Sequence, residues 1–166
     1  MASGTSVVAL LAELRQRRWT IGTAESLTGG LVAAAIIDVS GASTSMRGGI
    51  VAYDARVKRD LLGVGRELLE SHGAVHPQVA EQMAEGVRRA LSVDGSPVDV
   101  GLSTTGIAGP ESPDGQPVGL VYLGVATPYA YVGRRRVYEG TREEIRRQAT
   151  EDVLILALES LGTPTE

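Results

Sequence analysis

The connections between the apolar segments constrain the fold of this sequence most. Five segments have the length and apolar character of strands: 19–24, 47–53, 98–104, 118–126 and 131–138. Helix-length segments separate the first three, which predicts right-handed crossovers and parallel pairing. The third and fourth have no helix between them, and only a short turn at Pro128 and Tyr129 separates the fourth from the fifth. Both of these pairings are therefore predicted to be antiparallel.

The segments around these strands have helical patterns. A first helix is expected to be capped by Thr5 or Ser6. Further helices are predicted at 28–38, which is rich in Ala and Ile and reads as buried, and at 55–62, 66–72, 77–91 and 142–160. The sequence thus predicts an α/β fold: a mixed five-stranded sheet with helices on both faces and the fourth strand reversed. A chain of 166 residues suits one compact domain, so we expect residues 1–166 to form a single unit.

Composition excludes several classes of protein. A net charge of -4 argues against a nucleic-acid or anionic membrane partner. The absence of Cys excludes disulfides and fits a reducing compartment. The longest clean apolar run, 31–37, is too short to span a bilayer, and no basic segment precedes the first apolar residues, so we expect a cytoplasmic protein. With no Phe and one Trp, the core must be built from Val, Leu, Ile and Ala.

The basic residues comprise fifteen Arg and a single Lys, Lys58. An arginine stays protonated in proteins, whereas a desolvated lysine can lose its proton and act as a base. Lys58 follows the second strand, where Arg56 and Arg59 could lower its pKa by repulsion. The alternative is a surface lysine that pairs with Asp54 at an i, i+4 spacing.

The motif TAESLTGG, at 23–30, lies where the first strand ends and a helix begins. In open α/β sheets this turn binds ligands, because free N–H groups at the helix start point at the site. Ser26 could attack a carbonyl there, with these N–H groups as the oxyanion hole, while Gly29 and Gly30 let a substrate approach. The alternative is that Ser26 or Thr28 only caps the helix. If the first two strands are adjacent and parallel, Lys58 could reach Ser26.

Other polar segments carry weaker signals. The hydroxyl and glycine residues at 103–110 suit a phosphate, a ribose or a polarised carbonyl. Arg142 and Arg146, one helical turn apart, could clamp a phosphate or simply form a solvated basic face. Arg134 to Arg136 are expected at an exposed sheet edge. No metal site is expected, because Cys and HExxH are absent and the helix that would align His72 with His76 is broken.

Taken together, seven segments resemble the CinA C-terminal domain family: TAESLTGG, GGIVAYDARVK, LLGV, HGAV, TTGIAGP, QPVG and RRQAT. They occur in the family's order and cover about residues 7–161. The family includes stand-alone nicotinamide-nucleotide amidohydrolases, and the nucleotide-processing domain of its fused members is not expected here. The resemblance implies a three-layer α/β/α sandwich with one reversed strand.

The resemblance also implies an activity: hydrolysis of nicotinamide mononucleotide to nicotinate mononucleotide and ammonia, by a Ser/Lys mechanism without metal or cofactor. It places the nucleophile at Ser26 and the base at Lys58, with Tyr53 and Thr105 as polar site positions. The expected substrate-binding residues are Thr28, Gly29, Gly30, Gly106 and Arg142. The expected partner is a small nucleotide, with no nucleic acid and no membrane, and the resemblance is compatible with a homo-oligomer.

Three positions depart from the family's pattern. Ala55 stands where many relatives have Asn, His76 where Ser is usual, and Thr141 where a GDR-like motif has an acidic residue. Two other functions therefore stay open: a non-catalytic module that binds a nucleotide or a protein, and a Ser/Lys hydrolase of another small amide.

Overall fold

The computed structural model describes residues 3–113 and 115–162, which contain a five-stranded mixed sheet. Its strands are β1 (Ile21–Glu25), β2 (Met46–Val51), β3 (Val100–Gly106), β4 (Leu120–Ala126) and β5 (Tyr131–Val137). The α-helices are α1 (Ser3–Arg17), α2 (Leu31–Ile37), α3 (Ala55–Leu62), α4 (Arg66–His72), α5 (Pro77–Ala90) and α6 (Arg142–Gly162), and a short 3₁₀ turn covers Ala42–Thr44.

The strand order is β2-β1-β3-β4-β5. β1 pairs in parallel with β2 and with β3, whereas β4 runs antiparallel to both β3 and β5. The predicted mixed sheet with a reversed fourth strand is therefore confirmed. One detail of the prediction is wrong: β2 and β3 point the same way but are not neighbours, because β1 lies between them. The chain runs outward from β1 to β2 and then returns, so the winding direction reverses beside β1.

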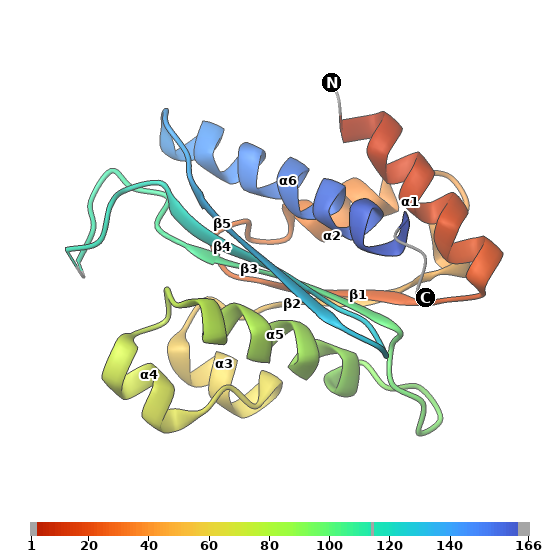
Figure 1. Cartoon of the computed structure of the whole chain (residues 1–166), viewed down its shortest axis with the longest axis horizontal. Helices are drawn as coiled ribbons and strands as arrows, with labels where there is room; N and C mark the ends of the chain where they lie inside the picture. The colour runs from red at the N-terminus through yellow and green to blue at the C-terminus, as the bar shows by residue number, and fades with distance from the viewer. Residues whose placement is uncertain (1–2, 114, 163–166) are drawn as a thin grey trace.

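That reversal also explains the two helical layers. Right-handed crossovers that proceed in opposite directions along a sheet place their helices on opposite faces. In Figure 1, α2 lies on one face together with α1 and α6, while α3, α4 and α5 cover the other. The gap between β1 and β3 is thus a topological switch point, where ligands bind outside the carboxyl ends of strands in open α/β sheets.

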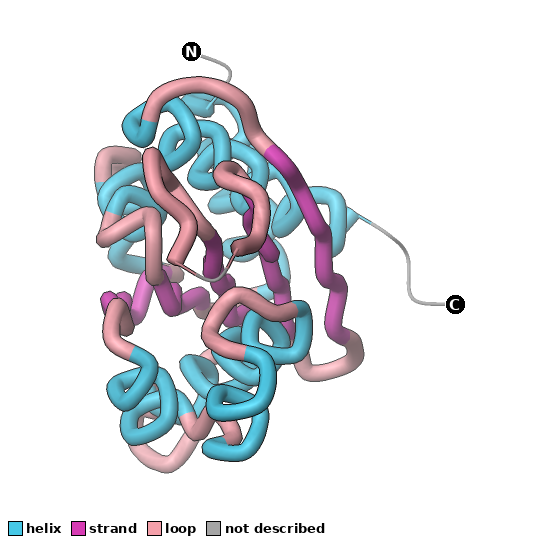
Figure 2. Tube along the Cα trace, turned by 90° about the vertical axis from the view of Figure 1, so that its left-hand side faces the viewer, coloured by secondary structure: helices cyan, strands magenta, loops and turns pink. Residues whose placement is uncertain are grey.

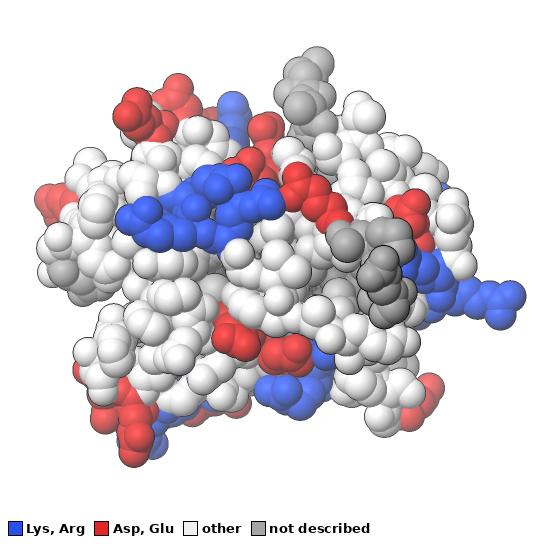
Figure 3. Space-filling view, in the orientation of Figure 1, with Lys and Arg blue, Asp and Glu red and all other residues white. Residues whose placement is uncertain are grey.

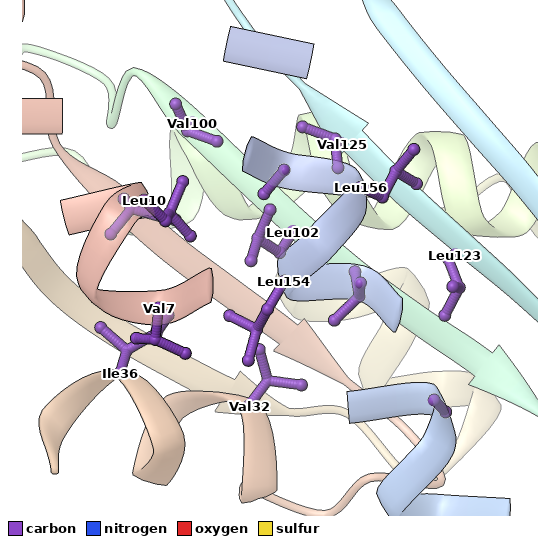
Figure 4. Packing of buried hydrophobic residues seen from close by; sticks show 14 of the residues in the cluster. Val7, Leu10, Val32, Ile36, Val100, Leu102, Leu123, Val125, Leu154 and Leu156 are labelled. Carbon is purple, nitrogen blue, oxygen red and sulfur yellow. The ribbon is translucent and has the colours of Figure 1, made fainter. Parts of the chain in front are cut away.

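The core under α1, α2 and α6 is aliphatic, as the composition predicted. Figure 4 shows Leu154 of α6 beside Leu102 of β3, and Val7 of α1 beside Ile36 of α2. A second cluster, which includes Met83 of α5, fills the other face. Because both faces of the sheet are covered, β1 is buried along its whole length.

Two helices differ from their predicted form. α1 already begins at Ser3, so Thr5 and Ser6 lie inside the helix and neither precedes it as a cap. α2 begins at Leu31, because Gly29 and Gly30 have positive φ angles and belong to a turn. It is also buried on one side only, since Ile37 is 61% exposed.

The opposite edge of the sheet is formed by β5, which carries the predicted run of arginines. Arg134 pairs with Glu159 at 2.6 Å and Arg136 with Asp152 at 3.1 Å, both on α6. In Figure 3, basic side chains gather in a band over the region where Figure 1 draws β5 and α6, with acidic side chains beside them. Over the described ranges, no helix is long and apolar enough to cross a bilayer.

Candidate active site

Ser26 directly follows β1, at the end of the sheet where the parallel strands finish. This end is the left-hand side of Figure 1, and Figure 2 views it face on, with several loops toward the viewer. Ser26 is 8% exposed, and its backbone N–H donates to the carbonyl oxygen of Thr104 at the end of β3, at 3.0 Å. The nucleophile candidate is therefore fixed to the strand across the switch point.

Lys58 reaches this serine from the opposite face of the sheet. Asp54 caps α3 by accepting from the N–H of Arg56 at 2.7 Å, which places Lys58 one turn into the helix. The Lys58 side chain is 1% exposed, and its Nζ lies 3.1 Å from Ser26 Oγ. The same amine donates to the carbonyl oxygens of Ala52, at 2.7 Å, and Tyr53, at 3.1 Å.

Burial lowers the pKa of Lys58 from 10.5 to about 8, and the nearby charge of Asp54 opposes the shift. Burial is one of the two causes expected from the sequence; the other, repulsion by Arg56 and Arg59, is not among the causes of the shift. Arg56 is instead bound to Asp54 and Arg59 to Asp60, each at 2.6 Å. The alternative of a surface Lys58 paired with Asp54 is also wrong, because the amine is buried beside Ser26.

The contacts of Nζ match the needs of a base. A protonated amine has three hydrogens, and three oxygens accept them here. A neutral amine has two hydrogens and one lone pair. When the carbonyls of Ala52 and Tyr53 take the two hydrogens, the lone pair is left for the hydroxyl of Ser26. This geometry allows proton transfer from the serine to Lys58.

A buried carboxylate that the sequence analysis gave no role holds the start of α2. Glu25 is 1% exposed and accepts from the N–H groups of Gly30 at 2.9 Å, Val32 at 3.1 Å and Ala33 at 2.8 Å. The expectation that free N–H groups of this helix point at a ligand is therefore wrong for these three. An acidic residue just before a predicted helix was the available signal, because carboxylates favour helix N-termini.

The turn between Ser26 and α2 keeps only part of its N–H groups free. The N–H of Gly29 donates to the carbonyl oxygen of Ser26 at 3.1 Å. Within residues 3–113 and 115–162, the N–H groups of Leu27 and Thr28 have no hydrogen-bond acceptor. These two are the free backbone donors in the turn that directly follows Ser26.

The threonines of this region are tied to one another and to the scaffold. The hydroxyls of Thr28 and Thr104 lie 2.7 Å apart, and Thr104, which belongs to the polar segment 103–110, supports the Ser26 turn. Thr105 is buried and donates to the carbonyl oxygen of Ala74 at 2.7 Å. A Cβ at Gly106 would lie 2.7 Å from the carbonyl oxygen of Leu120, so the packing of β4 accounts for this glycine.

The two arginines of α6 that could clamp a phosphate, Arg142 and Arg146, instead bind groups of the protein. Arg146 donates to the carbonyl oxygens of Leu27, at 2.7 Å, and Thr28, at 3.2 Å. Arg142 donates to the carbonyl oxygen of Gly109 at 2.7 Å and to the hydroxyl of Tyr53 at 3.3 Å. Tyr53 is 66% exposed, so it lies at the rim and is not a core aromatic. Among the described residues, no three His, Asp or Glu side chains form a metal-binding group.

Comparison with known proteins matches this arrangement to one family. A model of the CinA C-terminal domain matches residues 5–161, nearly the whole chain. The chain belongs to the CinA C-terminal domain family. It is 46% identical over 138 residues to a competence-damage inducible protein of Caldanaerobacter subterraneus, covering 82% of this chain and 32% of the relative. A CinA-like protein of Frankia casuarinae is 43% identical, over 92% of this chain and 34% of the relative. The chain thus spans about a third of the length of these curated relatives.

Solved structures agree with this assignment over the full fold. The competence/damage inducible protein CihA of Agrobacterium tumefaciens is 32% identical, with a TM-score of 0.89 over 98% of this chain and 97% of that one. A CinA superfamily protein of Escherichia coli is 28% identical, with a TM-score of 0.85 over 96% and 89%. The family and the sandwich fold are therefore shown.

Two of the three departures from the CinA pattern are residues that cap helices, and the third is an exposed residue. His76 caps α5 by accepting from the N–H of Gln78 at its Nδ1, at 3.2 Å, so it does what a serine would do there. Thr141 forms a reciprocal capping box with Glu144 at the start of α6. Ala55 is exposed at the first position of α3. Within the described part of the chain, none of the three forms a hydrogen bond with the side chain of Ser26 or Lys58.

Proposed function

We propose that this CinA domain hydrolyses the carboxamide of nicotinamide mononucleotide, with Ser26 as nucleophile and Lys58 as base. The observation that carries the chemistry is the distance of 3.1 Å between Ser26 Oγ and Lys58 Nζ, at an amine that is 1% exposed. The resemblance described above supports the choice of substrate. A desolvated amine beside a hydroxyl is one of the few arrangements that activates a serine without a histidine.

In the first half of the reaction, the neutral amine of Lys58 accepts the proton of Ser26 while Oγ attacks the carboxamide carbon. The carbonyl oxygen becomes an oxyanion, which the N–H groups of Leu27 and Thr28 can stabilise. Lys58 then gives its proton to the amide nitrogen as the carbon–nitrogen bond breaks. Ammonia leaves, and the nicotinoyl group stays on Ser26 as an ester.

Water completes the cycle. Lys58, neutral again, accepts a proton from water as the hydroxide attacks the ester carbon, and a second oxyanion forms at the same place. When the bond to Oγ breaks, Lys58 returns the proton to Ser26. Nicotinate mononucleotide leaves, and every proton is accounted for. The hydroxyl of Tyr53 accepts from Arg142 at the rim, which supports Tyr53 as a candidate contact for the part of the substrate that faces solvent.

Ammonia release from nicotinamide mononucleotide tests the proposal. Ser26→Ala is expected to lower kcat by at least about a thousandfold, because nucleophile removal leaves only binding and oxyanion stabilisation. Ser40→Ala, at an exposed position on the α2–β2 connection, serves as the matched control and should keep full activity. Equal rates for the wild type and Ser26→Ala would eliminate the enzyme and favour the binding module.

The substrate class needs a separate comparison. Activity is measured with the mononucleotide, its dephosphorylated riboside and free nicotinamide. A nucleotide amidohydrolase should prefer the first by a large factor in kcat/KM. Similar rates on all three would instead indicate a Ser/Lys hydrolase of small amides in general.

A further inference from the structure

The peptide that links Leu27 to Thr28 is held from one side only. Its carbonyl oxygen accepts from Arg146 Nε at 2.7 Å, and its N–H has no acceptor among the described residues. In a trans peptide the C=O and N–H point in opposite directions. The residue that binds the carbonyl therefore fixes the direction of the N–H. In this way Arg146 controls one of the two free donors in the turn that follows Ser26.

The following peptide is held in the same manner. Arg146 Nη2 donates to the carbonyl oxygen of Thr28 at 3.2 Å, and the N–H of that peptide, which belongs to Gly29, donates back to the carbonyl oxygen of Ser26 at 3.1 Å. The two nitrogens of one planar guanidinium thus fix two successive peptide planes. A rigid fork is suited to this task because its donors cannot rotate independently.

The turn also leaves space for this guanidinium. Gly29 has a φ of 59°, and a Cβ built there would lie 3.2 Å from Arg146 Nη2. A side chain at position 29 would be strained by this φ angle and would also crowd Arg146. This close approach agrees with the hydrogen bonds that the same guanidinium donates to the two carbonyls.

Glu25 limits which donors can serve the reaction. Because its carboxylate binds the N–H groups of Gly30, Val32 and Ala33, the start of α2 has none of these to offer a substrate. The free donors near Ser26 are those of Leu27 and Thr28, and only the peptide before Thr28 has its carbonyl bound to a cation. The positive charge at that carbonyl polarises the amide and makes its N–H a stronger donor to a developing oxyanion.

We propose that Arg146 is a positioning residue that aims and polarises the Thr28 N–H as an oxyanion donor. It acts through the backbone and does not itself bind the substrate phosphate. This inference rests on the proposed amidohydrolase function and adds to it the residue that orients the oxyanion hole. It also gives the RRQAT segment, at 146–150, a chemical role.

Kinetics of Arg146→Met and Arg146→Lys, with nicotinamide mononucleotide as substrate, test the inference. We expect kcat to fall by about 10- to 100-fold in Arg146→Met, with KM within twofold of wild type, because loss of one oxyanion donor costs about 100- to 1000-fold and misaiming costs less. Arg146→Lys keeps the charge but not the two-pronged guanidinium, so its kcat should lie between those of Arg146→Met and the wild type. Guanidinium ion added to Arg146→Met should restore part of kcat. The matched control is Arg147→Met, since Arg147 is exposed and, among the described residues, forms its ion pair with Glu143.

A binding measurement separates this role from a phosphate clamp. In the Ser26→Ala background, Arg146→Met should leave the Kd for nicotinamide mononucleotide within twofold. A tenfold or larger rise in Kd would make Arg146 a substrate ligand and overturn the inference. So would a kcat within twofold of wild type in either folded variant. Thermal unfolding shows whether each variant is folded. If Arg146→Met does not fold, the kcat and Kd of Arg146→Lys test the inference in its place. An inactive wild type would instead refute the proposed function.

Discussion

At the scale of single residues, the site depends on a lysine kept in an unfavourable place. Transferring an amine from water to a protein interior penalises its charged form. Lys58 has no carboxylate in hydrogen-bonding contact within the described chain, and its three acceptors are a hydroxyl and two carbonyls. These acceptors satisfy its hydrogens without holding the charge as a carboxylate would, and burial lowers the pKa of Lys58 to about 8.

Replacing Lys58 with arginine separates charge from basicity. Lys58→Arg keeps a cation at the position, but a guanidinium does not release its proton near neutral pH. We expect ammonia release to fall at least about a thousandfold, with circular dichroism confirming a folded chain. Arg56→Lys, on the exposed first turn of the same helix, is the control and should stay near wild type. Activity retained in Lys58→Arg would refute Lys58 as the base.

The pH dependence of the reaction follows from the same group. Below its pKa, Lys58 carries a proton and cannot accept one from Ser26. As the pH rises through about 8, the neutral amine becomes the main form. We therefore expect kcat/KM to increase about tenfold per pH unit well below that value and to level off above it. A profile that stays flat from pH 6 to 9 would contradict a lysine base.

At the scale of elements, the turn at 26–30 is the structural unit that matters most. Glu25 holds its far end through the N–H groups of α2, Arg146 holds its carbonyls, and Thr104 holds Ser26. Three different elements, β1, α6 and β3, thus fix five residues of irregular backbone. A turn held at several points can keep the nucleophile in one place, which catalysis by positioning requires.

Removing the charge of Glu25 should loosen this turn. Glu25→Gln keeps one acceptor oxygen but places an NH₂ group against backbone N–H groups. We expect the free energy of unfolding to fall by about 2–4 kcal/mol, because hydrogen bonds to a buried charge are each worth about 1.5–3 kcal/mol. Urea denaturation measures the change. Glu67→Gln, in the exposed first turn of α4, should cost less than about 0.5 kcal/mol. A similarly small loss for Glu25→Gln would show that the cap is dispensable.

At the scale of the whole molecule, catalysis depends on how two layers meet across the sheet. Ser26 lies between β1 and α2, and α2 covers one face of the sheet. Lys58 belongs to α3, which covers the other face. The position of α3 depends on its contact with α5, where Gly86 packs against Leu62. A Cβ at residue 86 would lie only 1.8 Å from the carbonyl oxygen of Leu62.

Gly86→Ala should therefore force α3 away from α5. Backbone atoms cannot move aside as a flexible side chain can, so we expect a loss of about 3 kcal/mol or more of stability. In any folded fraction, activity should fall because Lys58 moves with α3. Gly4→Ala in α1 is the control, since nothing lies within 4 Å of a Cβ there, and it should not destabilise the chain. Chemical denaturation measures the free energy of unfolding of both variants. Equal stabilities would rule out this helix contact as a constraint.

Much of the architecture could be predicted from local sequence. The bounds of α3 and α4 match the prediction residue for residue, and β4 is reversed as the short connection before β5 required. The reason is physical: hydrophobic periodicity, turn residues and connection length act within a few residues of one another. The strand order could not be predicted from local sequence in the same way, because two parallel strands joined by helices can have a third strand between them.

The candidate site divides in the same way. The sequence by itself determined which groups could react, since a lone Lys among arginines and a serine after a buried strand are visible without coordinates. Only the tertiary structure decided what surrounds them: Glu25 on the amides of α2, Arg146 on the carbonyls of the turn, and burial as the cause of the lowered pKa of Lys58. Arg146 lies 119 residues from Leu27. Contacts over such separations, and the desolvation they produce, arise only when the layers of the fold close around the sheet.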